Sequence, residues 1–342
     1  MLREQVVSWD ETGTLASRLR RWALSSSDQS KVVEGELLSR RSSLRIGGAA
    51  KAWIEVGTPA DLASLLAALG DEPFWCVGLG SNVLFPDEGI EEPVIRLGGE
   101  LATFAVHPDP AGGRAVVDVM AGAVNAHLVR GLLKAGYVGA EFLRLIPGTF
   151  GGAVALNAGT KDAELVQMLE TVQLATRERE ERCWKMTQFT PQELQMKYRH
   201  AELPEGALVV GGTIAVEEGD VDEARARVKY DKDRRDRTQP YRLASVGSTF
   251  ANPPGDYAGR LIEAAGLKGE VVGDAQISPL HANFFINRGE AKAENFLSLM
   301  ALARHRVREE FGVELTPEVR FVGFDGWARM LDLEEEWKDK DV

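Results

Sequence analysis

The chain has 342 residues, of which 44% are hydrophobic and 27% charged, enough for two or three domains with apolar cores. Its 40 Lys and Arg against 52 Asp and Glu give a net charge of −12, which argues against a general nucleic-acid binder, because phosphate contacts need clustered positive charge. No apolar run is long enough to span a membrane and the N-terminus lacks a signal-peptide core, so the cytoplasm is the expected compartment. Cys76 and Cys183 lie in separate segments without a CxxC motif, which predicts two core thiols and no metal site.

The predicted elements alternate between short strands and helices. Residues 1–40 are weakly patterned and predict a leader helix or arm. Thr58-Pro59 supplies an N-cap and a first-turn proline, and Gly70 a glycine stop, so a helix is expected between them. The turn-rich His107–Arg114 predicts a hairpin tip or an insertion. The other predicted elements, in chain order, are strands at 52–56, 74–77, 116–120, 208–216 and 283–286 and helices at 125–134, 221–237, 257–265 and 291–311.

Three glycine-centred loops indicate a ligand that carries phosphate. They are Arg45-Ile46-Gly47-Gly48, Gly78-Leu79-Gly80-Ser81-Asn82 and Pro147-Gly148-Thr149-Phe150-Gly151-Gly152. Glycine lets the backbone approach an anion closely and point successive N–H groups at it, so a pyrophosphate is the expected ligand. One such loop alone is more often a tight turn, and the prediction depends on all three. A Rossmann site is rejected at Gly78, because the chain continues as an extended segment to Pro86 where that fingerprint needs a third glycine and a helix.

Further short motifs follow in the order found in one family. They are Asn157-Ala158-Gly159, Tyr198-Arg199, Gly247-Ser248-Thr249-Phe250, Ala264-Ala265-Gly266-Leu267-Lys268-Gly269, His281-Ala282-Asn283-Phe284 and Pro317-Glu318-Val319-Arg320-Phe321. With this order over Ser42–Gly323, the chain resembles UDP-N-acetylenolpyruvoylglucosamine reductase, MurB. The resemblance implies an α+β fold of the PCMH type (vanillyl-alcohol-oxidase-like, VAO-like), in which two subdomains bind FAD and a C-terminal α/β domain binds a UDP-sugar.

The domain limits expected on this basis are contiguous. An N-terminal arm covers 1–40, an FAD-binding domain 41–217 in two subdomains (41–115 and 116–217), a UDP-sugar-binding domain 218–324, and an acidic tail 325–342. The chain has no long Tyr-bearing insertion between Val216 and Gly247, so it resembles the compact variant of the family.

The resemblance also implies the reaction and its residues. The reaction is the NADPH-dependent, FAD-mediated reduction of UDP-N-acetylglucosamine enolpyruvate to UDP-N-acetylmuramate in peptidoglycan synthesis. Ser248, in the Gly-Ser-x-Phe motif, is implied to be the proton donor. Arg199, in the Tyr-Arg motif, offers a forked positive charge to the developing enolate. Glu318 either donates a hydrogen bond as the neutral acid or, when ionised, orients Arg199 or a water.

The binding residues follow from the same motifs. Cofactor contacts are implied for Arg45, Ile46, Gly47, Gly48, Gly78, Gly80, Ser81, Asn82, Pro147, Gly148, Thr149, Gly151, Gly152 and Asn157, and substrate contacts for Tyr198 and Asn252. FAD is expected to be non-covalent, because Ala49-Ala50 follows the first loop where covalent relatives place a histidine. The expected partners are a UDP-sugar and NADPH, without nucleic acid, membrane or metal, and a monomer is expected.

Several positions depart from the family pattern. Thr160-Lys161-Asp162 replaces a glycine-rich turn, His200 stands where a serine is common, and Thr238 replaces a phosphate-contacting lysine. The charge run Lys229–Arg237 is taken as a solvated helix face in preference to a phosphate site. Two alternatives stay open at this point: another flavin oxidoreductase of the same superfamily, which would use oxygen, and a non-catalytic nucleotide-sugar binding protein.

Overall fold

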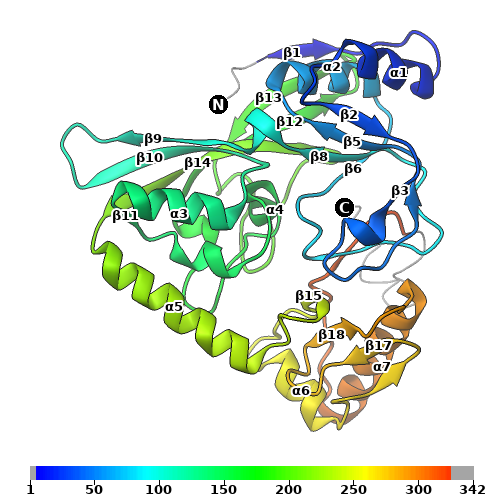
Figure 1. The fold of residues 1–342 in the computed structure, drawn as a ribbon, viewed down its shortest axis with the longest axis vertical. Coiled ribbons are helices and arrows are strands. Elements are labelled where there is room, and N and C mark those ends of the chain that lie inside the picture. Colours follow the sequence, from blue (N-terminus) through cyan, green and yellow to red (C-terminus); the bar gives the residue numbers. More distant parts are fainter. Residues whose placement is uncertain (1–4, 325–342) are drawn as a thin grey trace. The chain divides into compact units, whose positions relative to one another are not determined.

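A computed structural model describes residues 5–324. They pack into two units made of interleaved chain segments (Figure 1). Unit 1 contains the chain up to Glu34 together with Ala52–Gly78 and Pro93–Asp231. Unit 2 contains Gly35–Lys51, Leu79–Glu92 and the chain from Lys232 onward. The acidic tail expected at 325–342 lies outside the described residues.

Unit 1 is built on a seven-stranded antiparallel sheet. The strand order is β1-β13-β12-β14-β10-β9, and β11 pairs with β14. The strands are β1 (Val6–Ser8), β9 (Phe104–Pro108), β10 (Arg114–Met120), β11 (Tyr137–Val138), β12 (Leu169–Glu178), β13 (Cys183–Phe189) and β14 (Leu208–Glu218). In β10 the fully buried residues alternate with less buried ones, as in a strand with one face on a core. The predicted turn-rich segment is the tip of the β9–β10 hairpin.

A second, four-stranded sheet of unit 1 has the order β2-β5-β8-β6. Its strands are β2 (Lys31–Val33), β5 (Trp53–Val56), β6 (Trp75–Cys76) and β8 (Val94–Leu97). Helix α2 (Pro59–Leu69) connects β5 to β6, and both strands run parallel to β8. The Thr58 side chain accepts from the N–H of Asp61 at the start of α2, and Gly70 ends the helix with a φ of +60°. Both predicted helix ends are therefore confirmed.

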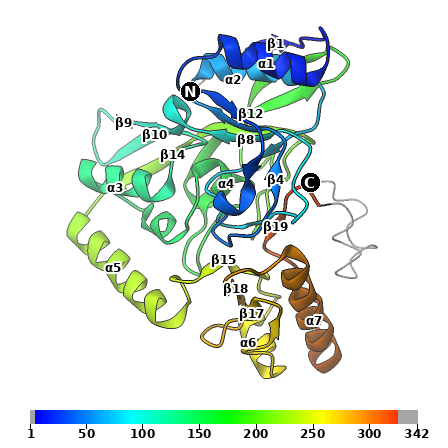
Figure 2. The same cartoon turned by 45° about the vertical axis from the view of Figure 1, so that its right-hand side comes forward.

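Four further helices lie wholly or partly in unit 1: α1 (Leu15–Ser25), α3 (Asn125–Ala135), α4 (Phe150–Ala155) and α5 (Val221–Thr238), the last of which continues into unit 2. Unit 1 also contains the 3-10 turns η2 (Gly99–Ala102), η3 (Glu141–Leu145) and η4 (Leu165–Gln167). Helix α3 ends at Gly136 in the left-handed conformation, as the sequence predicts. Figures 1 and 2 show α3 and α4 on the same side of β10 and β14. The core of unit 1 therefore joins helices to the covered face of the large sheet.

The N-terminal segment is an integral part of unit 1, where the sequence analysis expected an arm of uncertain role. Strand β1 pairs with β13 and extends the large sheet. Helix α1 packs on α2 through Trp22, which is 3% exposed and donates its indole N–H to the Asp61 carbonyl at 3.0 Å. The Asp61 carboxylate in turn accepts hydrogen bonds from the hydroxyls of Ser27 and Ser30. These contacts bury the apolar face of α1, which explains why the segment folds onto the domain.

Within the described residues, unit 2 contains three small sheets, two further helices and the C-terminal part of α5 from Lys232. A hairpin joins β3 (Glu36–Leu37) to β4 (Ala49–Ala50) through η1 (Leu38–Arg40), and β7 (Val83–Leu84) runs parallel to β19 (Arg320–Phe321). A four-stranded sheet has the order β15-β18-β17-β16, formed by β15 (Ala244–Ser248), β18 (Phe284–Asn287), β17 (Ala275–Ile277) and β16 (Val271–Val272). Helices α6 (Ala258–Ala264) and α7 (Ala293–Phe311) pack on each other.

The core of unit 2 draws on segments that are distant in the chain. Leu44, Ile46 and Leu84 are buried with Phe285 and Phe296 of the C-terminal part. This burial, together with the β7–β19 pair, explains why the segments 35–51 and 79–92 belong to unit 2. The packing units thus differ from the contiguous ranges expected from the sequence, and the functional domain limits stay a prediction.

The two cysteines differ in burial. Cys183 is 3% exposed and lies in the core as expected, whereas Cys76 is exposed at the end of β6, so the prediction of a core thiol was wrong for that residue. Cys76 is the last residue of the two-residue strand β6, and the chain then enters the Gly78 loop. No helix among residues 5–324 is long and apolar enough to cross a membrane.

Candidate active site

Ser248 lies at a bulge in the pairing of β15 with β18. Ser245 is opposite Ile286 and Ser248 is opposite Phe284, so three steps along β15 match two along β18. Gly247 has a φ of +79°, a left-handed conformation that glycine adopts without strain. A bulge of this kind redirects the side chain that follows it, and the side chain that follows is the hydroxyl of Ser248.

Glu318 is joined through the backbone to the residue after Ser248. Its N–H donates to the Thr249 carbonyl at 2.9 Å, and the next residues form a β-bridge between Phe250 and Pro317. The structure therefore brings Ser248 and Glu318, which are far apart in the sequence, onto neighbouring backbone segments of unit 2.

The second glycine loop is attached to the segment that contains Glu318 and leads into β19. The side-chain amide of Asn82 donates to the Glu318 carbonyl at 2.9 Å, and the N–H of Arg320 donates to the Asn82 carbonyl at 3.0 Å. Burial lowers the pKa of the Arg320 guanidinium, while the charge of Glu318 raises it. Arginine stays protonated in proteins, so Arg320 places a permanent positive charge beside Glu318.

Two of the predicted cofactor glycines are required by the protein's own backbone. An added Cβ at Gly80 would lie 1.9 Å from the Arg41 carbonyl oxygen, and one at Gly48 would lie 2.3 Å from the Asp87 carbonyl oxygen. Such distances are far inside van der Waals contact. The close approach of two backbone segments therefore requires glycine at both positions, whether or not a ligand binds there.

The Pro147–Gly152 loop of unit 1 has both occupied and open positions. The N–H groups of Phe150 and Gly151 donate to the carbonyls of Ala123 and Ala121, in the turn between β10 and α3, at 2.8 Å each. These two N–H groups are therefore not available to a ligand. An added Cβ at Gly152 would meet only the Thr149 hydroxyl, at 3.7 Å. The protein itself does not require glycine at 152, and the open space there suits a ligand.

Asn125, which begins α3, lies against this loop. Its N–H donates to Gly148 at 3.1 Å and its side-chain amide donates to Ile146 at 3.2 Å. Its side-chain oxygen is buried and has no hydrogen-bond partner among the described residues. An unpaired buried acceptor costs about 1–3 kcal/mol, so a donor from a bound molecule is expected, and the hydroxyl groups of FAD are donors of this kind. The loop and Asn125 therefore fit the implied cofactor.

Arg199 occupies a tight turn of unit 1. Lys197 and His200 exchange backbone hydrogen bonds of 3.0 and 2.9 Å across it. Arg199 has a φ of +56°, which costs a residue with a Cβ roughly 1–2 kcal/mol. Its guanidinium donates to the Gly159 carbonyl at 2.8 Å and lies 4.8 Å from the ring centre of Tyr198. The turn therefore holds the Arg199 side chain in one defined direction.

Asn157 supports this turn from the interior. The residue is fully buried, and its side-chain amide donates to the Lys197 carbonyl at 3.0 Å and to Glu164 at 3.1 Å. Its side-chain oxygen accepts from the N–H of Val166 at 2.9 Å. Because these groups are taken up within the protein, only the backbone of Asn157 is available for the predicted cofactor contact.

Other predicted positions have local structural partners. The Ile46 side chain is 2% exposed in the core of unit 2, so a ligand contact there involves the backbone. The side-chain oxygen of Asn252 accepts from the N–H of Ala258 at 3.1 Å, at the start of α6. Thr238 donates its hydroxyl to the Arg234 carbonyl in the last turn of α5. In the same helix Lys232 pairs with Asp236, as expected for a solvated charged face.

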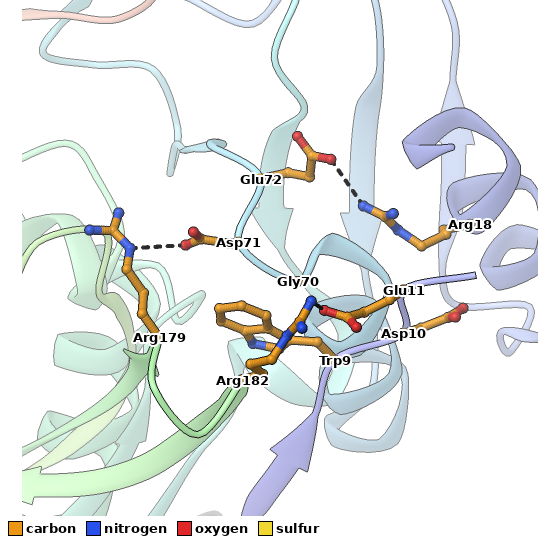
Figure 3. Close-up of a pocket in the computed structure, with 9 residues that line it drawn as sticks. All are labelled: Trp9, Asp10, Glu11, Arg18, Gly70, Asp71, Glu72, Arg179 and Arg182. Atoms are coloured by element: carbon orange, nitrogen blue, oxygen red, sulfur yellow. Dashed lines mark hydrogen bonds and ion pairs between the residues drawn. The ribbon is translucent and has the colours of Figure 1, made fainter. Parts of the chain in front are cut away.

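A separate recess of about 630 Å³ lies on unit 1 (Figure 3). Its lining comes from the β1–α1 connection, α1, the turn before β6 and the β12–β13 turn. The lining residues, none of which is a predicted site residue, are Trp9, Asp10, Glu11, Arg18, Gly70, Asp71, Glu72, Arg179 and Arg182. Its charges are paired with one another, with Arg18 3.1 Å from Glu72 and Arg179 3.1 Å from Asp71. Of these two pairs, that of Arg18 with Glu72 joins the N-terminal segment to the turn before β6.

Sequence reasoning missed two asparagines near the site. Asn125 stands outside every quoted motif, and only its place at the start of a helix before the third glycine loop offered a signal. Asn283 stood in a quoted motif without a role, and its side chain makes two hydrogen bonds to the backbone of Phe250, two residues after Ser248.

Comparisons with known proteins show which domains and which family the chain resembles. Residues 50–179 match the model of an FAD binding domain, and residues 239–322 match that of the UDP-N-acetylenolpyruvoylglucosamine reductase C-terminal domain. The UDP-N-acetylenolpyruvoylglucosamine reductase of Myxococcus xanthus (strain DK1622) is 41% identical over 86% of this chain and 93% of its own length. That of Methylococcus capsulatus is 42% identical over 85% and 93%. The crystal structure of MurB from Thermus caldophilus is 36% identical, with a TM-score of 0.70 over 85% of this chain and 99% of that one.

An FAD-binding domain together with this C-terminal domain defines a flavin-dependent oxidoreductase. The chain belongs to the UDP-N-acetylenolpyruvoylglucosamine reductase (MurB) family. The predicted fold class, a PCMH-type (VAO-like) α+β FAD-binding fold with a C-terminal α/β domain, is confirmed, as is FAD as the cofactor.

Proposed function

We propose that this chain reduces UDP-N-acetylglucosamine enolpyruvate to UDP-N-acetylmuramate with NADPH, a step of peptidoglycan synthesis. The proposal rests on the family and on one observation above all. The hydrogen bond from the Glu318 N–H to the Thr249 carbonyl holds a hydroxyl donor and a carboxylate on adjacent backbone segments. A carbon that must receive a proton next to a negatively charged group needs these two kinds of side chain.

FAD held by the glycine loops would supply the hydride chemistry, taking hydride from NADPH and delivering it to the terminal methylene carbon of the enolpyruvyl group. The neighbouring carbon, which bears the carboxylate, then carries enolate charge and takes one proton. Ser248 gives that proton from its hydroxyl, and the product gains two hydrogens in total. Arg199 stabilises the enolate and its carboxylate through the guanidinium fork, and Glu318 acts beside Ser248 as a donor or as an orienting carboxylate.

The binding roles are part of the same proposal. Gly148, Thr149 and Gly152 contact the pyrophosphate of non-covalent FAD, and the Arg45–Gly48 and Gly80–Asn82 loops are further cofactor contacts. Tyr198 and Asn252 contact the UDP-sugar. The protein acts in the cytoplasm as a monomer, without nucleic acid, membrane or metal.

The test is the absorbance spectrum of the purified protein, followed by an NADPH oxidation assay. A bound-flavin spectrum and NADPH oxidation that depends on the enolpyruvyl substrate, without oxygen consumption, are expected. A flavin oxidase would consume oxygen in place of this substrate. A non-catalytic binding protein would be colourless and would gain no activity with added FAD.

A further inference from the structure

One side chain holds the backbone that follows Ser248. Asn283 immediately precedes β18 and is 4% exposed. Its side-chain oxygen accepts from the N–H of Phe250 at 3.0 Å, and its side-chain amide donates to the carbonyl of the same residue at 2.8 Å. Its own carbonyl accepts from the N–H of Thr249 at 2.8 Å. Asn283 therefore binds both residues that follow Ser248.

We propose that Asn283 is a positioning residue for the proton donor Ser248, a role that rests on the proposed function. The bulge at Gly247 breaks the regular ladder between β15 and β18, and β15 ends at Ser248. A carboxamide carries one acceptor and one donor, the same pair that a peptide group offers. The side chain of Asn283 thus takes the place of a strand partner at the point where the ladder stops.

This arrangement connects Asn283 to Glu318 as well. Thr249 and Phe250, both fully buried, have Asn283 as a partner. The Thr249 carbonyl also accepts from the N–H of Glu318, and Phe250 lies opposite Pro317 in a β-bridge. Removal of the carboxamide leaves the N–H and carbonyl of Phe250 unpaired in the interior, where water does not replace the lost partner. The backbone between Ser248 and Glu318 must then shift.

His281 keeps the carboxamide residue oriented. The N–H of Asn283 donates to the His281 ring nitrogen at 3.2 Å, and the ring packs against Phe284. Burial, with Lys268 as a second cause, lowers the pKa of His281, so the ring stays neutral and able to accept this hydrogen bond.

The test is a double-mutant cycle on the two half-reactions of the FAD-loaded protein, followed anaerobically by flavin absorbance. Asn283→Ala is expected to leave flavin reduction by NADPH unchanged and to slow reoxidation by the enolpyruvyl substrate roughly 10- to 100-fold, since misplacing a reacting group by about 1 Å costs on that order. If Asn283 acts through Ser248, the double variant with Ser248→Ala reoxidises within about twofold of Ser248→Ala alone. The proposal would be overturned if the rate losses of Asn283→Ala and Ser248→Ala multiplied in the double variant. It would also be overturned if Asn283→Ala slowed both half-reactions equally.

Asn287→Ala is the matched control. Asn287 also lies on β18, is 6% exposed, and its side chain makes hydrogen bonds to Leu44, Gly289 and Ala291. Asn287→Ala is expected to lower the melting temperature. If it slows reoxidation at all, its rate loss should multiply with the rate loss of Ser248→Ala in the double variant.

Two further outcomes are informative: an Asn283→Ala protein that does not fold, and a wild-type protein that does not react with the substrate. If Asn283→Ala does not fold, the isosteric Asn283→Asp takes its place, because it keeps the acceptor for the Phe250 N–H and replaces the amide donor by a carboxylate oxygen, which also brings a negative charge against the Phe250 carbonyl. Wild-type reoxidation rates in that variant would overturn the positioning role. If the reduced flavin of the wild-type protein did not react with the enolpyruvyl substrate, the proposed function itself would be overturned. The flavin absorbance of the wild-type protein shows this before any variant is compared.

Discussion

The side-chain amide of Asn82 lies 2.9 Å from the backbone carbonyl oxygen of Glu318. A residue of a glycine loop predicted to bind the cofactor is thereby attached to the segment that carries a proposed catalytic carboxylate and leads into strand β19. The adjoining pair of β7 and β19 continues the attachment. The loop and the strand therefore form one rigid piece of unit 2, although more than 230 residues separate them in the chain.

The first prediction concerns the glycine positions. Gly152→Val should fold normally, because an added Cβ meets only the Thr149 hydroxyl at 3.7 Å, but it should lose flavin during dialysis by obstructing the ligand. Gly80→Val is the contrasting variant and should fail to fold stably, since its Cβ would lie 1.9 Å from the Arg41 carbonyl oxygen. Thermal melting of the flavin-free proteins and the flavin-to-protein ratio measure both effects. Stoichiometric flavin in a folded Gly152→Val protein would remove this loop from the cofactor site.

The second prediction concerns Arg199. Arg199→Lys should lower kcat and kcat/KM together, because an ammonium group does not reproduce the guanidinium fork that stabilises the enolate. The variant also loses the contact with the Gly159 carbonyl, which orients the side chain. Arg225→Lys, in the exposed ion pair with Asp222 on α5, is the matched control and should leave both constants unchanged. An unchanged kcat in Arg199→Lys would exclude a catalytic role.

The third prediction concerns the N-terminal segment and pH. Burial raises the pKa of Asp61, but hydrogen bonds from Ser27 and Ser30 outweigh it, so the folded-state pKa lies below the usual value. A lowered folded-state pKa stabilises the protein above the unfolded pKa of about 3.9, and this contribution is lost as pH falls through the folded-state pKa. Asp61→Asn should therefore lower the free energy of unfolding at pH 7 by about 1–3 kcal/mol, a gap that closes in acid below about pH 4.

Denaturant unfolding across this pH range measures the effect. Asp28→Asn makes the same substitution at an exposed position of the same segment and should change the free energy of unfolding by less than about 0.5 kcal/mol. Equal stability of wild type and Asp61→Asn at pH 7 would mean that the hydroxyl contacts contribute nothing to holding α1 on α2.

Local signals predicted much of the fold, and long-range packing decided the rest. The ends of α2 and α3 follow from Thr58, Pro59, Gly70 and Gly136, because capping depends on neighbouring residues alone. Strands β12 and β13 were not predicted, since their stability comes from pairing with each other and with β14. The same limit applied to the site, where motif order indicated Ser248 and Glu318 but no local pattern revealed the carboxamide of Asn283.

The most direct test of the account is the Ser248→Ala variant, followed through both half-reactions by anaerobic rapid mixing. Its flavin should bleach with NADPH at nearly the wild-type rate and recover its colour with the enolpyruvyl substrate about 10²–10⁴-fold more slowly, the usual contribution of general acid catalysis. Ser248→Cys should recover part of the rate, and Ser245→Ala on the same strand should behave as wild type. If Ser248→Ala slowed both half-reactions equally, or neither, Ser248 would not be the proton donor.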